Sequence, residues 1–434
     1  MEIEYNNKAN KDSSKGWIQR LKEESWEAEL LVSAIAIFGT FQMFDIVSWA
    51  TNFFINVLNP NQYKVGYFIV TFGLLAISIL TAMFVIHFVL RAYWIGLVGL
   101  NSVFPDYSIE DSAYSKIYTK KLLSILPKLK DSIHKVDELC SVVFSVAFTF
   151  LFIYGYMAVF ISIFLLVFNL LSDYVHHYIL LFPVILFVIL LSVQMVITIF
   201  ANLKANKEKE KLQTVNFKIT KFTNMIMLGP LYKSFLQITM IFGSNFKKKK
   251  SLVYLILTFI FGGFLMLVIQ LPKTNILYLA AKKNYYNSTK IYSSFYKDDN
   301  KNNTFLLTPE IDSDKVDTDV IKIFIPVFYH EENFREETCD SFENDSEKPL
   351  EIQREAKTNF LLNCIEKHYK VYIDDQEVDV SYLRQNAHSR TNQKGVVSYL
   401  DITNLEKGLH VITFKKEYKN TEHLKWKIPF YKVK

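Results

Sequence analysis

The sequence predicts an α-helical multi-pass membrane bundle of five spans, followed by a small all-β, sandwich-like C-terminal domain. Three observations predict it: five long apolar stretches fill the first 272 residues, the connections between them alternate in lysine content, and the tail is polar and strand-like. The chain has 434 residues, of which 50% are hydrophobic, and its mean hydropathy is +0.14. A soluble protein of this length is usually less apolar, so the composition already favours a membrane protein.

The first 28 residues are polar and carry charges of both signs. A cleaved signal peptide would instead combine a short basic start, a brief apolar core and a small-residue cleavage site. Residues 1–28 are therefore predicted to be a cytoplasmic segment, and the first span to stay in place as an anchor.

The transmembrane domain is predicted to cover residues 29–272. A helix needs roughly 20 apolar residues to cross about 30 Å of hydrocarbon. Five stretches qualify, at about 29–56, 66–98, 140–171, 178–202 and 251–271.

Lysine counts in the connections predict the orientation. The loops 101–138 and 203–250 are rich in lysine, whereas 57–65 holds only Lys64 and 172–177 holds no basic residue. Because basic loops stay in the cytoplasm, the N-terminus is predicted to be cytoplasmic and the tail extracytoplasmic. The residue bias is typical of an AT-rich bacterial genome, so we expect the inner membrane and a periplasmic tail.

The two basic loops carry helical signals. In 111–139, apolar residues recur at three- and four-residue steps, and Pro127 predicts a kink or two separate helices. The stretch 222–246 is apolar but broken by Gly229 and Pro230, which favours an interfacial or re-entrant helix. If 224–243 crossed the membrane instead, the tail would be cytoplasmic. The run that follows is expected to meet anionic lipid headgroups or to act as a plain topology signal: Lys247, Lys248, Lys249 and Lys250.

Ionisable and polar side chains at membrane depth are costly and need a role. Glu29, His87 and Arg91 are predicted to lie at one level at the cytoplasmic ends of spans one and two, which favours a Glu29–Arg91 clamp over a proton pathway. Gln42 and Asp45 lie nearer the outer boundary of span one. Asp45 is expected to face the outer headgroups or, with Gln42, to line a polar cavity. Gln194 of span four is a further polar residue on which a channel or transporter would depend.

Two further groups of residues allow weaker predictions. Asp173, His176 and His177 have a spacing that a metal site could use, but the flanking tyrosines favour an ordinary aromatic belt, so no cofactor is predicted. Cys339 and Cys364 both fall in the exported tail and predict a disulfide, with two free thiols as the alternative. No catalytic residue is predicted.

The tail divides into a linker at 273–300 and a β-rich domain at 301–434. Two short strand-like runs flank Asp374 and Asp375, which predicts a hairpin, and 346–366 is the one stretch that favours a helix.

Three classes of function remain open on the sequence. The first is a non-enzymatic envelope-assembly, scaffold or sensor component that binds a partner through the β domain. The second is an oligomeric ion channel or transporter that uses polar residues around Asp45 and Arg91. The third, a membrane enzyme acting on lipid or glycan, is least favoured. Membrane lipids and a protein partner or second copy are expected contacts. Nucleic acid is not, because the lysines flank apolar spans.

Overall fold

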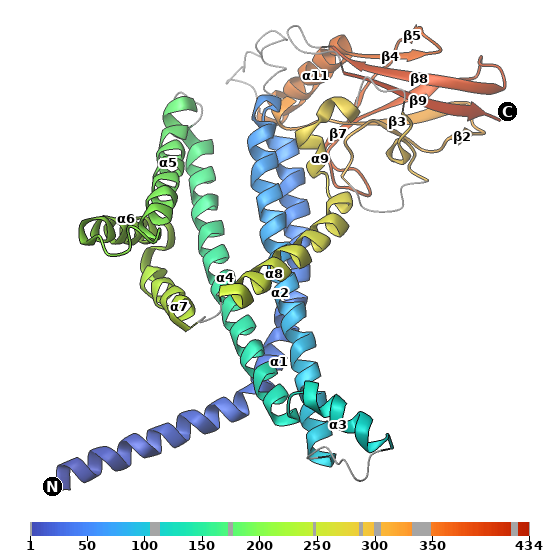
Figure 1. Ribbon diagram of the computed structural model, residues 1–434. Coiled ribbons are helices and arrows are strands. Elements are labelled where there is room, and N and C mark those ends of the chain that lie inside the picture. Colours follow the sequence, from blue (N-terminus) through green and yellow to red (C-terminus); the bar gives the residue numbers. More distant parts are fainter. Residues whose placement is uncertain are drawn as a thin grey trace. The chain divides into compact units, whose positions relative to one another are not determined.

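The computed structural model of the protein describes residues 2–104, 113–171, 177–245, 249–285, 290–298, 305–331, 349–417 and 424–433 (Figure 1). Residues 2–25 are described by their backbone alone.

Five long helices carry the apolar stretches. They are α1 (Glu2–Val57), α2 (Tyr63–Val103), α4 (Leu129–Leu171), α5 (His177–Ala201) and α8 (Lys249–Gln270). In the described part of the chain, five helical segments are long and apolar enough to cross a membrane. They match the five predicted spans, because hydropathy depends on local composition.

The basic loops form shorter helices, and the predicted breaks are confirmed. The helix α3 (Lys116–Ile125) ends before Pro127, and α4 starts at Leu129. After α5 the chain forms α6 (Glu210–Leu228), a single turn η2 (Gly229–Leu231) and α7 (Tyr232–Asn245). Neither α6 nor α7 qualifies as a span, since Gly229 and Pro230 interrupt the apolar stretch.

The chain divides into two compact units. The first consists of residues 1–43 and 75–268, and the second of residues 44–74 and 269–434. The second unit therefore combines the end of α1 and the start of α2 with the whole C-terminal region.

The first unit has its core where α2, α4 and α8 meet. Leu80 and Phe84 of α2 pack with Val143 of α4 and Phe259 of α8, and all four are buried. Gly263 of α8 faces Ile79 of α2 so closely that a Cβ on the glycine would lie 2.8 Å from the Ile79 Cα. Small residues of this kind allow two helix backbones to approach in a membrane.

In its described residues, the C-terminal region contains one long helix and nine short strands. They are α11 (Leu350–His368), β1 (Glu310–Ile311), β2 (Lys315–Val316), β3 (Val320–Pro326), β4 (Tyr369–Ile373), β5 (Gln376–Val378), β6 (Leu383–Gln385), β7 (Gly395–Asp401), β8 (Gly408–Lys416) and β9 (Leu424–Lys432). One sheet has the order β1-β3-β7-β6 and the other β2-β9-β8-β4-β5. All pairs are antiparallel except β2 with β9.

The two sheets share one hydrophobic core, which confirms the sandwich-like prediction. Ile323 and Ile325 of β3 point inward from the first sheet, and Ile412, Phe414 and Ile428 point inward from the second. Alternate residues of a strand face opposite sides, so the inward residues of both sheets form this core. On the outer side of the first sheet, Phe324 and Val397 pack with Leu306 in a second buried cluster.

The predicted hairpin is also confirmed. β4 and β5 pair directly, and Asp374 and Asp375 form the turn with positive φ angles of 49° and 65°. Asp tolerates this left-handed region better than most residues, and two such residues in succession form the turn that suits the twist of a hairpin.

The segment 273–300, expected as a linker, is partly packed in its described residues. It contains a short helix, α9 (Ile276–Ala280), and a turn, η5 (Ser293–Phe295). Tyr278, Phe295 and Tyr296 are buried, and the last two belong to the sandwich core. A polar composition suggested a linker, but the aromatic side chains within it find apolar partners.

The close approach of α8 and α2 predicts that Gly263→Ala destabilises the first unit. The added methyl group must displace backbone atoms of α2, and overpacking of this kind typically costs about 1–3 kcal/mol. Thermal unfolding of the purified protein in detergent should show a lower Tm. Gly155→Ala is the matched control, because a Cβ there meets nothing within 4 Å. Equal Tm values for both variants would contradict the close approach.

Candidate functional site

A buried arginine joins three helices in the first unit. Arg91 of α2 donates from Nη1 to Asp137 Oδ1 of α4 at 2.7 Å, and from Nη2 to the carboxylate of Glu29 on α1. The Arg91 side chain is 1% exposed, while Glu29 and Asp137 are 14% and 26% exposed. The arginine therefore holds α1, α2 and α4 together through charge-assisted hydrogen bonds.

His87 lies one helical turn from Arg91 and is fully buried. Its Nδ1 lies 2.7 Å from Ser33 Oγ, and its Nε2 lies 3.8 Å from Glu29 Oε2.

One face of α2 carries a row of buried polar atoms. None of these atoms has a hydrogen-bond partner among the described residues. They are His87 Nε2, Arg91 Nε, Trp94 Nε1 and Asn101 Oδ1. The spacing of four, three and seven residues puts them along a single helical face. Buried polar atoms are nearly always satisfied, so such a row marks a face that suits polar contacts.

The structure brings together only some of the predicted intramembrane residues. Glu29, His87 and Arg91 meet as predicted, but Gln42 and Asp45 are exposed on α1, and Gln194 is half-buried on α5. Asp137 was not among the residues predicted from the sequence. The feature that could have indicated it is the position of this acidic residue, three residues before the third predicted span.

Several predicted residues lie outside the described part of the chain. They are Asp173, His176, Lys247, Lys248 and Cys339. His177 starts α5, and Lys249 and Lys250 start α8, but their side chains are not described. Cys364 of α11 is buried and disulfide-bonded, whereas Cys140 is free. The pairing of Cys364 with Cys339 stays a prediction.

The three-helix clamp predicts a strong effect of Arg91→Met. Removing one partner from a buried ion pair typically costs about 3–5 kcal/mol, because the remaining charge is uncompensated. Thermal unfolding in detergent should show a large fall in Tm. Adding Glu29→Gln and Asp137→Asn to Arg91→Met should restore most of the loss. Arg384→Met, which changes an exposed arginine, is the control. A triple variant no better than the single one would contradict a clamp based on charge.

The β domain of the second unit contains its own buried ion pair. Lys416 of β8 donates to Glu331 Oε1 at 2.8 Å and to the Pro326 carbonyl at 3.1 Å. Its ammonium group lies 5.0 Å from the Tyr369 ring centroid and 5.9 Å from that of Trp426. Both charged side chains are 5% exposed or less, so the aromatic rings exclude water from the pair.

The attraction between the two charges outweighs the cost of burying them. Burial alone would raise the pKa of Glu331, but the neighbouring Lys416 ammonium holds that pKa below its usual range. Burial likewise opposes the charged form of Lys416, and the Glu331 carboxylate keeps the pKa of Lys416 above its usual range. Both groups are therefore charged over a wide pH range.

This ion pair lies next to the contact between the β domain and the first helical hairpin, within the second unit. The Tyr329 N–H donates to Asn56 Oδ1 at 3.0 Å, and His330 Nδ1 lies 3.2 Å from the Asn56 carbonyl oxygen. The Tyr63 ring meets the His330 ring edge-on at 6.0 Å. Burial lowers the pKa of His330, so this histidine is neutral at pH 7. The end of α1 is thus fixed to the β domain.

The Glu331–Lys416 pair predicts a defined pH dependence of stability. The lowered pKa of Glu331 contributes stability above its ordinary value of 4.5, and this is lost as pH falls through the folded-state value. The raised pKa of Lys416 contributes below 10.5, and this is lost as pH rises through its folded-state value. Between these limits the contribution of the pair should be constant.

The measurement is denaturant unfolding of the full-length protein from pH 3 to pH 11. Lys416→Met should cost about 3–5 kcal/mol at pH 7. Combining it with Glu331→Leu should recover most of that loss and remove the decrease in stability at both low and high pH. If the double variant still loses stability at both ends of the pH range, other groups cause the pH dependence.

A second buried charge cluster lies in the first sheet. Glu310 accepts from Arg390 and lies 3.3 Å from His388 Nε2. Burial, followed by the nearby positive charges, lowers the pKa of His388 to about 4. The histidine is therefore neutral at pH 7, and its Nδ1 lies 3.2 Å from Thr391 Oγ1 in the same turn. No periodic pattern marks this cluster in the sequence, since Glu310 is distant in the chain from His388 and Arg390.

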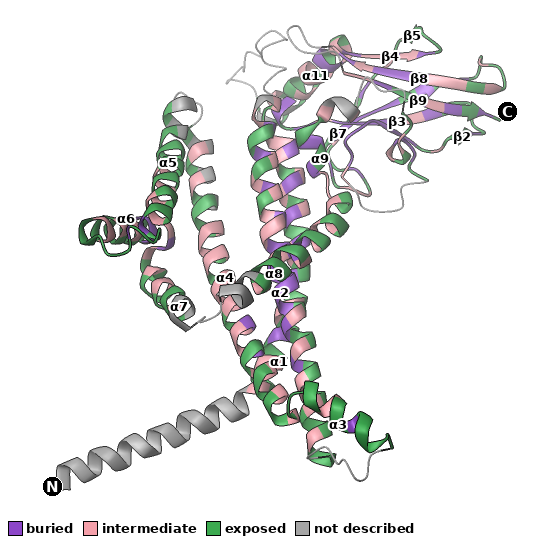
Figure 2. Cartoon of the chain, viewed as in Figure 1, coloured by how far each residue is buried: buried purple, intermediate pink, exposed green. Residues whose placement is uncertain are grey.

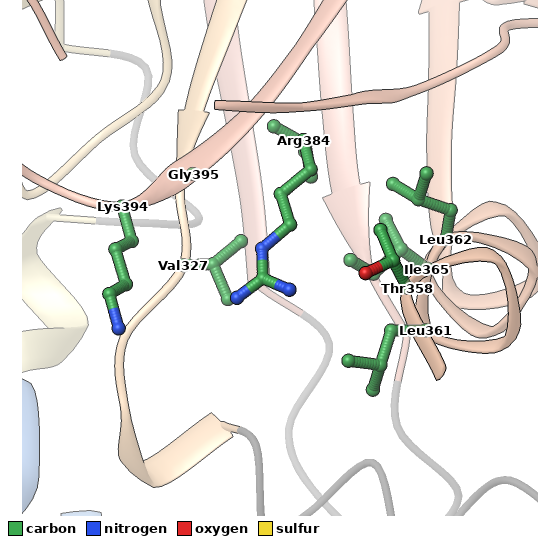
Figure 3. Close-up of a pocket in the computed structure, with 9 residues that line it drawn as sticks. Val327, Thr358, Leu361, Leu362, Ile365, Arg384, Lys394 and Gly395 are labelled. Carbon is green, nitrogen blue, oxygen red and sulfur yellow. The ribbon is translucent and has the colours of Figure 1, made fainter. Parts of the chain in front are cut away.

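The β domain has two hollows of different character. A small cavity of about 30 Å³ lies between α11 and the first sheet, where Arg384 and Leu361 line it (Figure 3). Its volume is about that of a water molecule, which is too little for a substrate. A larger, open hollow of about 510 Å³ lies between β2 and β3, with Val316, Val320 and Val433 among its lining residues.

An exposed apolar strip adjoins the larger hollow. We define it as Leu409, Tyr431 and Val433, which are 71%, 50% and 45% exposed. Leu409 and Tyr431 are cross-strand partners on β8 and β9, and Val433 follows two residues after Tyr431 on the same face. Charged residues of both signs line the same hollow: Asp298, Asp312, Asp317, Lys315 and Lys322.

No group of three or more His, Cys, Asp or Glu side chains that could hold a metal ion occurs among the described residues. Comparison of the chain with protein-family models, with characterised proteins and with solved structures found no match.

Proposed function

We propose that the protein is a membrane-anchored binding component, a scaffold or sensor, whose β domain recognises a protein partner through the exposed strip and the adjoining hollow. The observation that carries the proposal is this surface. It combines an apolar strip that includes a tyrosine with an adjoining hollow that is lined by charges of both signs, and protein interfaces usually join apolar and charged groups in this way.

The hollow suits a partner that inserts a side chain or a short loop. Its volume of about 510 Å³ lies within the range of ordinary ligand sites, and apolar and charged groups share its lining. Tyrosine is among the residues that most often contribute strongly to binding, which supports a central role for Tyr431.

The attachment of the β domain supports a role in assembly or sensing. Asn56 fixes the domain to the end of α1, and Asn275 donates to Asn52 Oδ1 one helical turn earlier at 2.9 Å. A domain held in this way presents its surface in a fixed orientation to its own hairpin. Binding energy is then not spent on ordering a flexible tether.

The lysine-rich loops support an extracytoplasmic β domain, which in a bacterium with two membranes means the periplasm. With five spans, the end that follows α8 lies opposite to the N-terminus. The partner would accordingly be an envelope protein or a second copy of this chain.

The test is site-specific photo-crosslinking in cells, with a photoreactive phenylalanine analogue at Tyr431. We expect an adduct of defined mass that weakens in the Leu409→Asp background. Tyr399 on the other sheet is the matched control, since it is also a tyrosine of similar exposure, 56% against 50%. Absence of adducts at Leu409, Tyr431 and Val433, or equal adducts at Tyr399, would exclude the strip as the interface.

A second candidate function is passage of protons or ions along α2, and the row of four buried polar atoms favours it. In proteoliposomes with a pH-sensitive dye, wild-type protein should then carry measurable flux. Asn101→Leu should lower that flux several-fold without touching the Arg91 clamp. Asp45→Asn, at an exposed position outside the row, should not change it. A complete absence of flux would remove this candidate, and loss of flux in Asp45→Asn alone would put the path elsewhere.

A further inference from the structure

The helix α6 packs against the first unit through polar residues. Asn216 Oδ1 accepts from Thr198 Oγ1 of α5 at 3.0 Å, and Gln213 Nε2 donates to the Ala201 carbonyl at the end of α5 at 2.9 Å. Thr223 and Asn224 are buried on the same side of α6. The helix therefore lies across the end of α5 and turns an uncharged polar face toward the protein (Figure 1).

Several large apolar residues of α6 face outward, although Leu228 at its end is buried. Val215, Phe222 and Ile226 are 46%, 50% and 38% exposed, and their spacing of seven and four residues puts them on one stripe. Figure 2 shows that α5 is also largely exposed. A soluble protein would bury this stripe and expose the asparagine and glutamine.

A third sector of α6 carries positive charge. Lys211, Lys218 and Lys221 are exposed and lie beside the apolar stripe on the helical wheel. Lysines that flank an exposed apolar stripe are the pattern of a helix that rests in a membrane interface.

The contacts between α6 and α5 determine the level of the apolar stripe along the span. The large side chains of α5 are exposed along its length, for example Phe182 at 62%, Ile189 at 53% and Ile199 at 55%, as suits a helix that faces acyl chains. Gln213 holds the start of α6 at the last turn of α5, so α6 lies at the level where that span leaves the hydrocarbon.

At its other end, α6 meets α4. Gly229 follows α6 with a φ of 48°, and a Cβ there would collide with the Tyr156 hydroxyl group. The helix is thus held at both ends, and it cannot rotate its apolar stripe toward the protein.

We infer that α6 is an interfacial helix that binds an anionic phospholipid surface. Its apolar stripe inserts among the upper acyl chains, and its lysines contact the headgroups. The bilayer is favoured over a protein partner because α6 packs against α5, whose large apolar side chains are exposed, and because Lys211, Lys218 and Lys221 lie beside the stripe.

The first experiment measures depth in full-length protein reconstituted in nanodiscs. An environment-sensitive fluorophore is attached to Phe222→Cys or Lys218→Cys in a Cys140→Ala background. We expect lipid with brominated acyl chains to quench the label at 222 and aqueous iodide to quench the label at 218. Ile189→Cys, in the middle of α5, is the control for full lipid exposure. Quenching at 222 by iodide alone would overturn the inference.

The second experiment tests the headgroup. In equimolar mixtures, bromine is carried either by phosphatidylglycerol or by phosphatidylcholine. Quenching at 222 should be about two-fold stronger from the anionic lipid, because each lysine attracts such headgroups. Replacing Lys211, Lys218 and Lys221 by Gln should abolish the difference and keep the total quenching. Equal quenching by both lipids in the wild type would overturn the anionic specificity. A loss of all lipid quenching once the protein is in cell membranes would indicate that a protein covers the stripe instead.

Discussion

The cost of removing charge from water is the constraint on which the first unit depends. Arg91 is almost fully buried, and a guanidinium at that position is tolerated only if carboxylates meet it. Glu29 and Asp137 come from two other helices, so the compensation of one charge also determines which helices are neighbours. The hydrophobic contacts of Leu80, Phe84 and Val143 then pack around helices that the charges have already paired.

The same constraint recurs in the β domain with a different consequence. Lys416 and Glu331 are buried among aromatic rings, and residue 330, beside the glutamate, meets the end of α1. The buried pair holds the turn that carries His330, and this turn fixes the hairpin to the domain. The ion pair thus stabilises both the sandwich core and the attachment of the β domain to α1, because the five residues 327–331 belong to both.

The surfaces of the two units suit different surroundings. The exposed residues of α5 are apolar, and α6 carries an apolar stripe with lysines beside it, which fits lipid. The strip on the β domain is small and adjoins a hollow lined by charges of both signs. This contrast separates the surface that we assign to the bilayer from the surface that we assign to a partner. Apolar exposure alone does not distinguish them, and the charges around each surface do.

Local sequence patterns were sufficient to predict the five apolar helices, the breaks at Pro127 and Gly229, the Asp374–Asp375 hairpin and the Glu29–Arg91 pair. These depend on local composition, on turn chemistry and on the matching depth of two adjacent spans. The role of Asp137, the Glu331–Lys416 pair and the outward stripe of α6 became apparent only from the three-dimensional structure. Each of these depends on which face of an element meets a segment distant in the chain, and one-dimensional periodicity does not encode that choice.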